Sequence, residues 1–268
     1  MKSCRPITLL TDFGLDDPFV GIMKGVILGI APEASVIDIC HDLPSYDIAQ
    51  AAFLLHVSYP YFPPETIHVV VIDPGVGSSR RPLLAAAGNY FFIGPDNGVL
   101  SYVFSQTEGL RVFEITASHY FLSPPSSTFH GRDVFAPVAA YLSKRVDVEV
   151  FGEQIQDFTK IPIPVPQARG EGTLVGEILR VDRFGNLLTN ISHEALSQFR
   201  KGKGPSRITI GIGEIEIPGL RSFFSEGEKG RAEAIMGSLG YLEVFVREGN
   251  ASSVTGKKRG DEVRVILS

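Results

Sequence analysis

Four short turns in the first half of the sequence place acidic and polar side chains beside glycine. They are Thr11-Asp12-Phe13-Gly14, Asp73-Pro74-Gly75-Val76-Gly77, Gly94-Pro95-Asp96-Asn97-Gly98 and Phe129-His130-Gly131-Arg132-Asp133. Asp, Asn, Gly and Pro are common turn residues, so any single one of these turns is more readily explained by structure than by function. Four such turns together favour a binding pocket. The second turn is not a phosphate-binding loop, because no Gly-Lys-Ser/Thr follows it, and its spacing does not match a dinucleotide fingerprint.

By residue type alone, the acidic and histidine side chains in and around these turns suit a divalent metal ion. Carboxylates and imidazoles are the usual protein ligands of such ions. The candidate ligands are Asp12, Asp16, Asp17, His41, Asp42, Asp73 and His130. Asp16 and Asp17 also have a sufficient structural explanation, since acidic side chains stabilise the N-terminus of a following helix.

The segments that must position these turns alternate between strand-like and helix-like patterns. Apolar runs predict strands, and apolar residues at helical spacing predict helices, in the order strand 7–10, helix 19–30, strand 36–40, helix 48–59, strand 67–72 and helix 134–142. This alternation predicts an α/β domain with a mostly parallel sheet flanked by helices. In such sheets ligands bind outside the carboxyl ends of the strands, where the first two turns should lie.

A proline-rich segment, residues 161–166, ends this alternation, because alternating prolines remove backbone donors and favour an extended connector. Beyond it the sequence contains mostly short strand-like runs with glycine turns, which predict a smaller, all-β, barrel-like domain. These runs are 176–181, 207–212, 215–217, 241–246 and 262–267, with a short helix near 192–199. The predicted organisation is an N-terminal domain over 1–160, a linker over 161–170 and a C-terminal domain over 171–268.

The composition excludes several classes of protein. Among 268 residues, 25 are basic and 30 are acidic, which gives a net charge of −5 and no basic surface for nucleic acid. No apolar run is long enough to span a membrane, and no secretory segment is evident. Cys4 and Cys40 are too few for a disulfide scaffold or a zinc cluster, so a cytoplasmic location is expected.

Further short blocks accompany the four turns, and their order and spacing through both predicted domains form a specific combination. They are Lys24-Gly25, Arg80, Asp182-Arg183-Phe184-Gly185-Asn186, Thr189-Asn190, Ser238, Gly240-Tyr241-Leu242 and Asn250-Ala251. With them, the sequence resembles the S-adenosylmethionine hydroxide adenosyltransferases over essentially its whole length. These are adenosine-forming hydrolases related to the bacterial fluorinase and chlorinase. The resemblance implies a homotrimer whose active sites lie between the N-terminal domain of one subunit and the C-terminal domain of the next.

The resemblance also implies a catalytic triad of Asp73, Arg80 and His130 that handles the attacking water. The residue types suit this role, because water has a pKa of about 15.7 and needs a base or a field that favours hydroxide. Attack at C5′ of the ribose would expel methionine as a neutral thioether, with no metal or other cofactor. By type Arg81 is as good a candidate as Arg80, and the resemblance selects Arg80. Which triad member removes the proton is left open.

For substrate binding, the resemblance assigns seven further residues. Asp12 would accept hydrogen bonds from both ribose hydroxyls, Phe129 would pack along the substrate, Phe184 would stack on adenine and Asn186 would contact the nucleoside; Asp182 would receive the methionine ammonium, Ser238 its carboxylate, and the Ala251 backbone the adenine edge. Structural alternatives stand beside several of these roles. Asp12 could cap the next helix, Phe129 could belong to the core, and Asp182 with Asn186 could simply form a turn at a strand end.

The sequence departs from the halogenating relatives at four positions. Those enzymes have Tyr in place of Asp73 and His130, Ser in place of Gly131, and Arg in place of Leu239. Two ionisable groups without that Ser favour a site that handles water over one that holds a dehydrated halide. The substitution at Leu239 leaves open how the methionine carboxylate is held. The leading hypothesis is hydrolysis of S-adenosylmethionine to adenosine and methionine; the alternatives are a metal-dependent phosphohydrolase and a non-enzymatic binder of S-adenosylmethionine or adenosine.

Overall fold

The computed structural model of the protein describes residues 4–203 and 206–268. The chain forms two compact units, 1–163 and 164–268. In chain order the first unit contains β1 (Ile7–Thr11), α1 (Phe19–Ile30), β2 (Val36–Cys40), α2 (Ile48–Ser58), β3 (Ile67–Val71), β4 (Pro82–Ala87), β5 (Tyr90–Pro95), α3 (Ser101–Gln106), β6 (Arg111–Glu114), a π-helical turn (Gly131–Phe135), α4 (Ala136–Ser143) and β7 (Gln154–Ile155).

The sheet of the first unit has the strand order β2-β1-β3-β5-β4-β6-β7. The pairs β2-β1, β1-β3 and β3-β5 are parallel, whereas β4 pairs antiparallel with both β5 and β6, and β7 pairs antiparallel with β6. The α/β class predicted from the sequence is confirmed, and the sheet is mixed. Its antiparallel part begins with the hairpin of β4 and β5, which the sequence analysis did not include.

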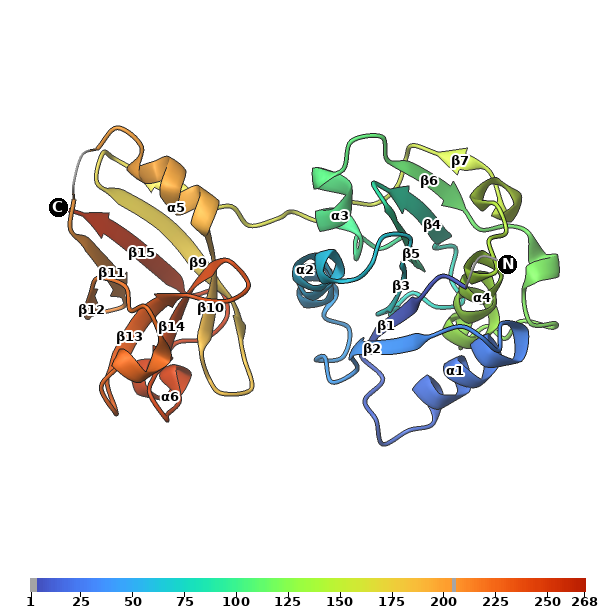
Figure 1. Cartoon of the computed structure of the whole chain (residues 1–268), viewed down its shortest axis with the longest axis horizontal. Coiled ribbons are helices and arrows are strands. Elements are labelled where there is room, and N and C mark those ends of the chain that lie inside the picture. Colours follow the sequence, from blue (N-terminus) through green and yellow to red (C-terminus); the bar gives the residue numbers. More distant parts are fainter. Residues whose placement is uncertain (1–3, 204–205) are drawn as a thin grey trace. The chain divides into compact units, whose positions relative to one another are not determined.

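Helices cover both faces of this sheet, with α1 and α4 on one face and α2 and α3 on the other (Figure 1). Neighbouring residues of β1 show the consequence: Leu9 packs in the cluster under α1 and α4, while Leu10 packs in the cluster under α2. All five residues of β1 are buried, as are all five of β3. Burial on both faces explains why these strands are mostly apolar with no regular alternation. The polar side chains of Thr8 and His68 are buried as well and contact each other, with Thr8 Oγ1 2.8 Å from His68 Nδ1.

The second unit is an antiparallel, barrel-like sheet. Its elements are β8 (Gln167–Arg169), β9 (Thr173–Val181), β10 (Leu187–Ser192), α5 (His193–Arg200), β11 (Ile208–Ile212), β12 (Ile215–Pro218), β13 (Ala232–Met236), β14 (Tyr241–Val246), α6 (Ala251–Thr255) and β15 (Glu262–Leu267). The strand order is β12-β11-β15-β9-β10-β14-β13. The two edges approach each other where Arg221 N donates to Ala234 O at 2.7 Å, so the sheet is nearly closed. The predicted all-β class of this unit is confirmed.

The segment predicted as a linker, 161–170, includes residues tied to each unit. Ile161 N donates to Ser101 Oγ at 2.9 Å in the first unit, and β8 pairs with β9 in the second. Among the helices of the described residues, none is long and apolar enough to cross a membrane.

Candidate active site

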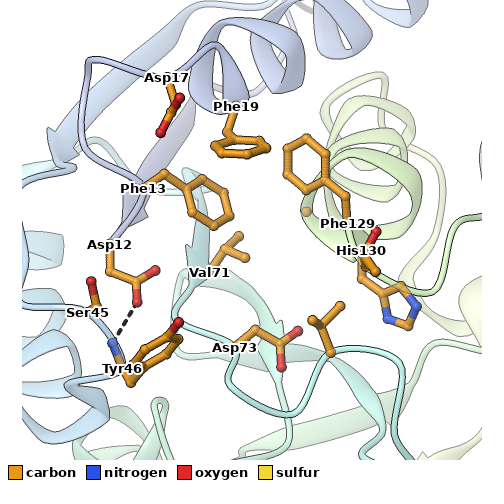
Figure 2. Close-up of a pocket in the computed structure, with 13 residues that line it drawn as sticks. Asp12, Phe13, Asp17, Phe19, Ser45, Tyr46, Val71, Asp73, Phe129 and His130 are labelled. Atoms are coloured by element: carbon orange, nitrogen blue, oxygen red, sulfur yellow. Dashed lines mark hydrogen bonds between the residues drawn. The ribbon is translucent and has the colours of Figure 1, made fainter.

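The carboxyl ends of β1 and β3 lie side by side, because Thr11 is in parallel register with Val71. Asp12 and Asp73 follow these strand ends, and both reach a pocket of about 420 Å³ (Figure 2). Its lining residues are Asp12, Phe13, Asp17, Phe19, Ser45, Tyr46, Val71, Asp73, Val76, Thr128, Phe129, His130 and Gly131. The structure therefore brings four of the predicted site residues, Asp12, Asp73, Phe129 and His130, to one pocket.

The turn after β3 folds Arg80 back onto Asp73. Val76 N donates to Asp73 O at 3.2 Å, and Ser78 N donates to Gly75 O at 3.1 Å. Gly77 has φ +78°, and a Cβ there would stand 2.2 Å from Ser127 O. Only glycine fits this combination of left-handed backbone and close approach. The glycine thus lets the 73–80 turn lie against the loop that carries His130.

Asp73, Arg80 and His130 form one hydrogen-bonded cluster. Arg80 Nε donates to Asp73 Oδ1 at 2.9 Å, and Arg80 Nη2 donates to Asp73 Oδ2. The same Nη2 lies 2.7 Å from His130 Nδ1. The side chains of Arg80 and Asp73 are only 8% and 6% exposed, so this forked ion pair is shielded from water and strengthened accordingly. Arg80 Nη1 is also buried and has no partner among the described residues.

The contact with Arg80 defines the protonation of His130. A guanidinium can only donate, so Nδ1 must be the acceptor and a neutral ring carries its proton on Nε2. The pKa of His130 lies below its usual value, first because burial disfavours the charged ring and second because Arg80 is cationic; Asp73 and Asp133 act in the opposite direction. His130 therefore presents an N–H donor at neutral pH.

The loop before His130 is held by a buried carboxylate. Asp133 accepts a hydrogen bond from Ser126 N at 2.8 Å and two from Arg132 at 2.6 and 3.0 Å. Burial acts to raise the pKa of Asp133, but the hydrogen bonds from Arg132 and Ser126 together hold the pKa below its usual value. Ser126 Oγ in turn accepts from Phe129 N at 3.1 Å. Asp133 thus orders the loop that presents Phe129 and His130.

Three phenylalanines form an aromatic wall of the pocket. The ring centroids of Phe13, Phe19 and Phe129 lie 5.2 to 5.7 Å apart in tilted and edge-to-face arrangements (Figure 2). Sequence reasoning singled out Phe129 but missed the other two as site residues. Phe19 belongs to the apolar pattern of α1 and Phe13 to a turn, so only the packing of these rings reveals them as part of the pocket.

Asp12 contacts a neighbouring loop. Its Oδ2 accepts a hydrogen bond from Tyr46 N at 2.8 Å, and Tyr46 has φ +67°, which is uncommon for a non-glycine residue (Figure 2). The N-cap of α1 is Pro18, so the alternative that Asp12 caps this helix is wrong. Sequence reasoning did not identify Tyr46 as a pocket residue.

The candidate metal ligands are not gathered into a metal centre. Within 4–203 and 206–268, no group of three His, Cys, Asp or Glu side chains is arranged to hold an ion. His41 is buried, with Nδ1 2.8 Å from Thr11 Oγ1 and Nε2 3.0 Å from Asp38 Oδ1. His41 therefore fastens the end of β1 to Asp38 of β2.

In the second unit, Asp182 closes the turn between β9 and β10. Its Oδ1 accepts from Phe184 N at 2.9 Å and from Asn186 N at 2.8 Å, and its Oδ2 accepts from Asn186 Nδ2 at 3.0 Å. Asp182 and Asn186 therefore do form a turn at the end of a strand, as the structural alternative for this pair predicted. The turn rests on α6: Ser252 N donates to Gly185 O at 2.9 Å, which brings the turn next to Ala251.

The turn displays Phe184 at the edge of a second pocket of about 680 Å³. Phe184 is 75% exposed, unusual for a large apolar side chain, and Asn186 lines the same pocket. Phe224 and Phe245, in edge-to-face contact at 4.9 Å, line it too and were missed from the sequence. The other two predicted residues of this unit differ in exposure, with Ser238 exposed after β13 and Ala251 fully buried at the start of α6.

Glu243 on β14 is a further acidic residue near Asp182. Burial raises its pKa, and the charge of Asp182 raises it further. A Cβ on Gly237 would stand 1.9 Å from Glu243 Oε1, so the carboxylate rests against the backbone just before Ser238. Sequence reasoning did not identify Glu243, which belongs to an ordinary strand pattern.

Comparisons with known proteins identify relatives across both units. Residues 7–152 match the model of the SAM hydroxide adenosyltransferase N-terminal domain, and residues 176–264 match that of its C-terminal domain. A Thermus thermophilus protein named (R)-S-adenosyl-L-methionine hydrolase is 35% identical over 98% of this chain and 100% of its own length. A protein of the same name from Methanocaldococcus jannaschii is 34% identical over 97% of this chain and 95% of its own. A fluorinase from Nocardia brasiliensis is 27% identical over 97% of both chains.

A solved structure of an uncharacterised conserved protein from Thermotoga maritima superimposes with a TM-score of 0.89 at 34% identity. The superposition covers 97% of this chain and 99% of that one.

Proposed function

Since the chain belongs to the SAM hydroxide adenosyltransferase family, we propose that it hydrolyses S-adenosyl-L-methionine to adenosine and L-methionine. Relatives that cover nearly the whole chain at 33–35% identity carry the name of this hydrolase. The observation that supports the mechanism best is the buried cluster of Asp73, Arg80 and His130, two of whose members line the pocket.

In this mechanism Asp73 accepts the proton of the attacking water. His130 Nδ1 already accepts from Arg80, so its Nε2–H is free to donate to the water oxygen and orient it. Arg80 fixes both partners and supplies a positive field that favours hydroxide. The new bond joins the water oxygen to C5′, while the C5′–S bond breaks and its electron pair stays on sulfur. Because hydroxide and sulfonium cancel their charges, a water-poor pocket with fixed dipoles accelerates the step, and the mechanism requires no metal.

The substrate is divided between residues of the two units. In the first unit, Asp12 accepts hydrogen bonds from the ribose hydroxyls and Phe129 packs along the substrate. In the second, Phe184 stacks on adenine, while Asn186 and the Ala251 backbone contact the nucleoside. Asp182 receives the methionine ammonium and Ser238 the carboxylate. These roles follow the family resemblance and the exposure of Phe184 beside an aromatic pocket.

We further propose a cytoplasmic homotrimer in which each active site combines the N-terminal unit of one subunit with the C-terminal unit of the next. This assembly follows the family resemblance, in which each of the two compact units of the chain supplies part of a site. Sedimentation or light scattering measures the mass of the assembly directly. A monomer that is fully active at all concentrations would contradict the shared site.

The function is tested by incubating the purified protein with S-adenosyl-L-methionine and resolving the products by chromatography. Equal amounts of adenosine and methionine are expected, with or without a chelator, and Asp73→Ala should abolish their formation. Tight binding without product would indicate the non-enzymatic binder. Activity towards phosphate esters that disappears on chelation would indicate the phosphohydrolase.

A further inference from the structure

The turn formed by residues 94–98 contributes no side chain to the pocket beside Asp73, although it is as rich in polar and glycine residues as the turns that do. Its acidic residue, Asp96, is only 6% exposed. Asp96 Oδ1 accepts a hydrogen bond from Thr159 N at 2.7 Å, and Asp96 N donates to Arg81 O at 2.9 Å. A buried carboxylate is costly unless it is paired and hydrogen-bonded, so these contacts compensate for the burial of Asp96.

Arg81 is the centre of that network. Its Nε and Nη2 donate to Asp96 Oδ2 at 3.0 and 2.7 Å. Its Nη1 donates to Asp157 Oδ1 at 3.0 Å, and its Nη2 also donates to Asp157 O at 2.5 Å. All three nitrogens of the guanidinium are therefore occupied, which leaves the side chain one orientation.

A second connection runs from the same turn to the strand that carries Asp73. Asn97 Nδ2 donates to Ile72 O at 2.8 Å, and Asn97 Oδ1 accepts from Val99 N at 3.1 Å. Ile72 directly precedes Asp73, so the amide of Asn97 fixes the peptide from which the Asp73 side chain projects.

Arg80 and Arg81 stand next to each other just before β4 begins at Pro82, and their side chains diverge. Arg80 reaches Asp73 and His130, while Arg81 reaches Asp96 and Asp157. Fixing Arg81 on one side therefore fixes the direction in which Arg80 leaves the chain on the other.

We propose that Asp96, acting through Arg81, positions Arg80 for the reaction, while its neighbour Asn97 fixes the peptide that carries Asp73. Asp96 is a positioning residue, because its hydrogen bonds stop at Arg81 and Thr159 and it does not line the pocket. The proposal rests on the hydrolase function proposed above. It explains why two adjacent arginines, alike by type, have different tasks.

The test compares Asp96→Asn with Glu233→Gln, a matched control in the other unit. Glu233 is also a buried carboxylate that accepts two hydrogen bonds from one arginine, Arg221, both at 3.0 Å, and it lines neither the pocket beside Asp73 nor the pocket beside Phe184. Asp96→Asn should lower kcat about 10- to 100-fold, the loss expected for a misplacement on the order of 1 Å, with KM nearly unchanged. Glu233→Gln should lower the midpoint of thermal unfolding but keep kcat.

A readout independent of turnover is the nitrogen NMR signal of His130. In the unmodified protein Nδ1 should have the shift of an acceptor, and Asp96→Asn should move it because Arg80 no longer holds its place. Equal kcat in both variants with an unmoved His130 signal would overturn the proposal. If Asp96→Asn does not fold, Arg81→Lys serves, since it keeps the positive charge but loses the two-nitrogen contact with Asp96; unchanged kcat and His130 signal in it would likewise refute the idea. Failure of the proposed function is different, because the unmodified enzyme would then form no adenosine.

Discussion

Replacing Arg80 with Met tests how the buried cluster controls His130. Burial and then the positive charge of Arg80 lower the pKa of His130, whereas Asp73 and Asp133 act to raise it. Arg80→Met removes the lowering charge and the donor to Nδ1, and it leaves both carboxylates in place. The pKa of His130 should therefore rise. The doubly protonated imidazolium of His130 would compete with water for Asp73. The apparent pKa of the acid limb in the pH-rate profile should therefore rise together with the pKa of His130.

The cost of this replacement follows from the burial of the pair. Arg80 and Asp73 are 8% and 6% exposed, and breaking such a pair leaves an uncompensated buried carboxylate, which costs about 3–5 kcal/mol of folding free energy. The turnover rate should fall by about 10²–10³, the usual loss when a fixed electrostatic donor is removed. The losses of stability and of turnover have the same origin, because the guanidinium of Arg80 donates hydrogen bonds to both Asp73 and His130.

The assay is an NMR titration of His130 in the unmodified protein, Arg80→Met and Arg80→Lys, together with kcat over pH. Arg80→Lys keeps the charge but not the fork, so it should shift the pKa of His130 less than Arg80→Met while still reducing kcat. A His130 midpoint that falls or stays constant in Arg80→Met would refute the electrostatic account, because the remaining charges can only raise it.

Three further variants probe other parts of the structure. Burial lowers the pKa of His68 to about 3, so the folded state resists its protonation while the unfolded chain takes up a proton below about 6.5. The free energy of unfolding should thus fall by about 1.4 kcal/mol per pH unit as pH falls from about 6.5 towards 3. His68→Gln should remove this contribution, and an unchanged pH dependence in denaturant titrations of the variant would contradict the account. Gly77→Ala should lower kcat and stability, because the added Cβ would collide with Ser127 O. The control Gly88→Ala, at φ +58° in open space, should cost only about 1–2 kcal/mol of stability. Equal kcat in the two variants would contradict the role of the close approach at Gly77. Phe184→Ala should raise KM about 5- to 150-fold by loss of stacking, with a thermal midpoint near that of the unmodified protein, and an unchanged KM would remove Phe184 from the adenine site.

The sequence predicted those parts of the fold in which local pattern and tertiary environment agree. Strands buried on both faces, such as β1 and β3, are mostly apolar without regular alternation, and α1 has a clear helical period. The β4 and β5 hairpin was missed. β4, with the sequence PLLAAA, lacks the β-branched and aromatic residues that mark a strand, whereas β5, with the sequence YFFIGP, does carry such residues in its local sequence. In the second unit β10 and β13 were missed, although each pairs with the strand next to it in the chain, β9 and β14 respectively; β10 also pairs with the distant β14.

The candidate site divides in the same way. The meeting of Asp12 and Asp73 could be predicted, because parallel strands end at a common edge. The choice between Arg80 and Arg81 could not be made by residue type, since only the backbone direction into β4 decides which of them reaches Asp73. Phe19, Tyr46 and Glu243 carry no motif, and their proximity to the proposed site depends on loop packing and strand register.

Oxygen-18 water provides the most direct test of the central claim, that water attacks C5′ of S-adenosyl-L-methionine in the pocket beside Asp73. The reaction is run to completion in oxygen-18 water, the products are separated, and their masses are measured by mass spectrometry. The mechanism predicts one oxygen-18 atom in the 5′-hydroxyl of adenosine and none in the methionine. Adenosine without the label, or no adenosine at all, would contradict it.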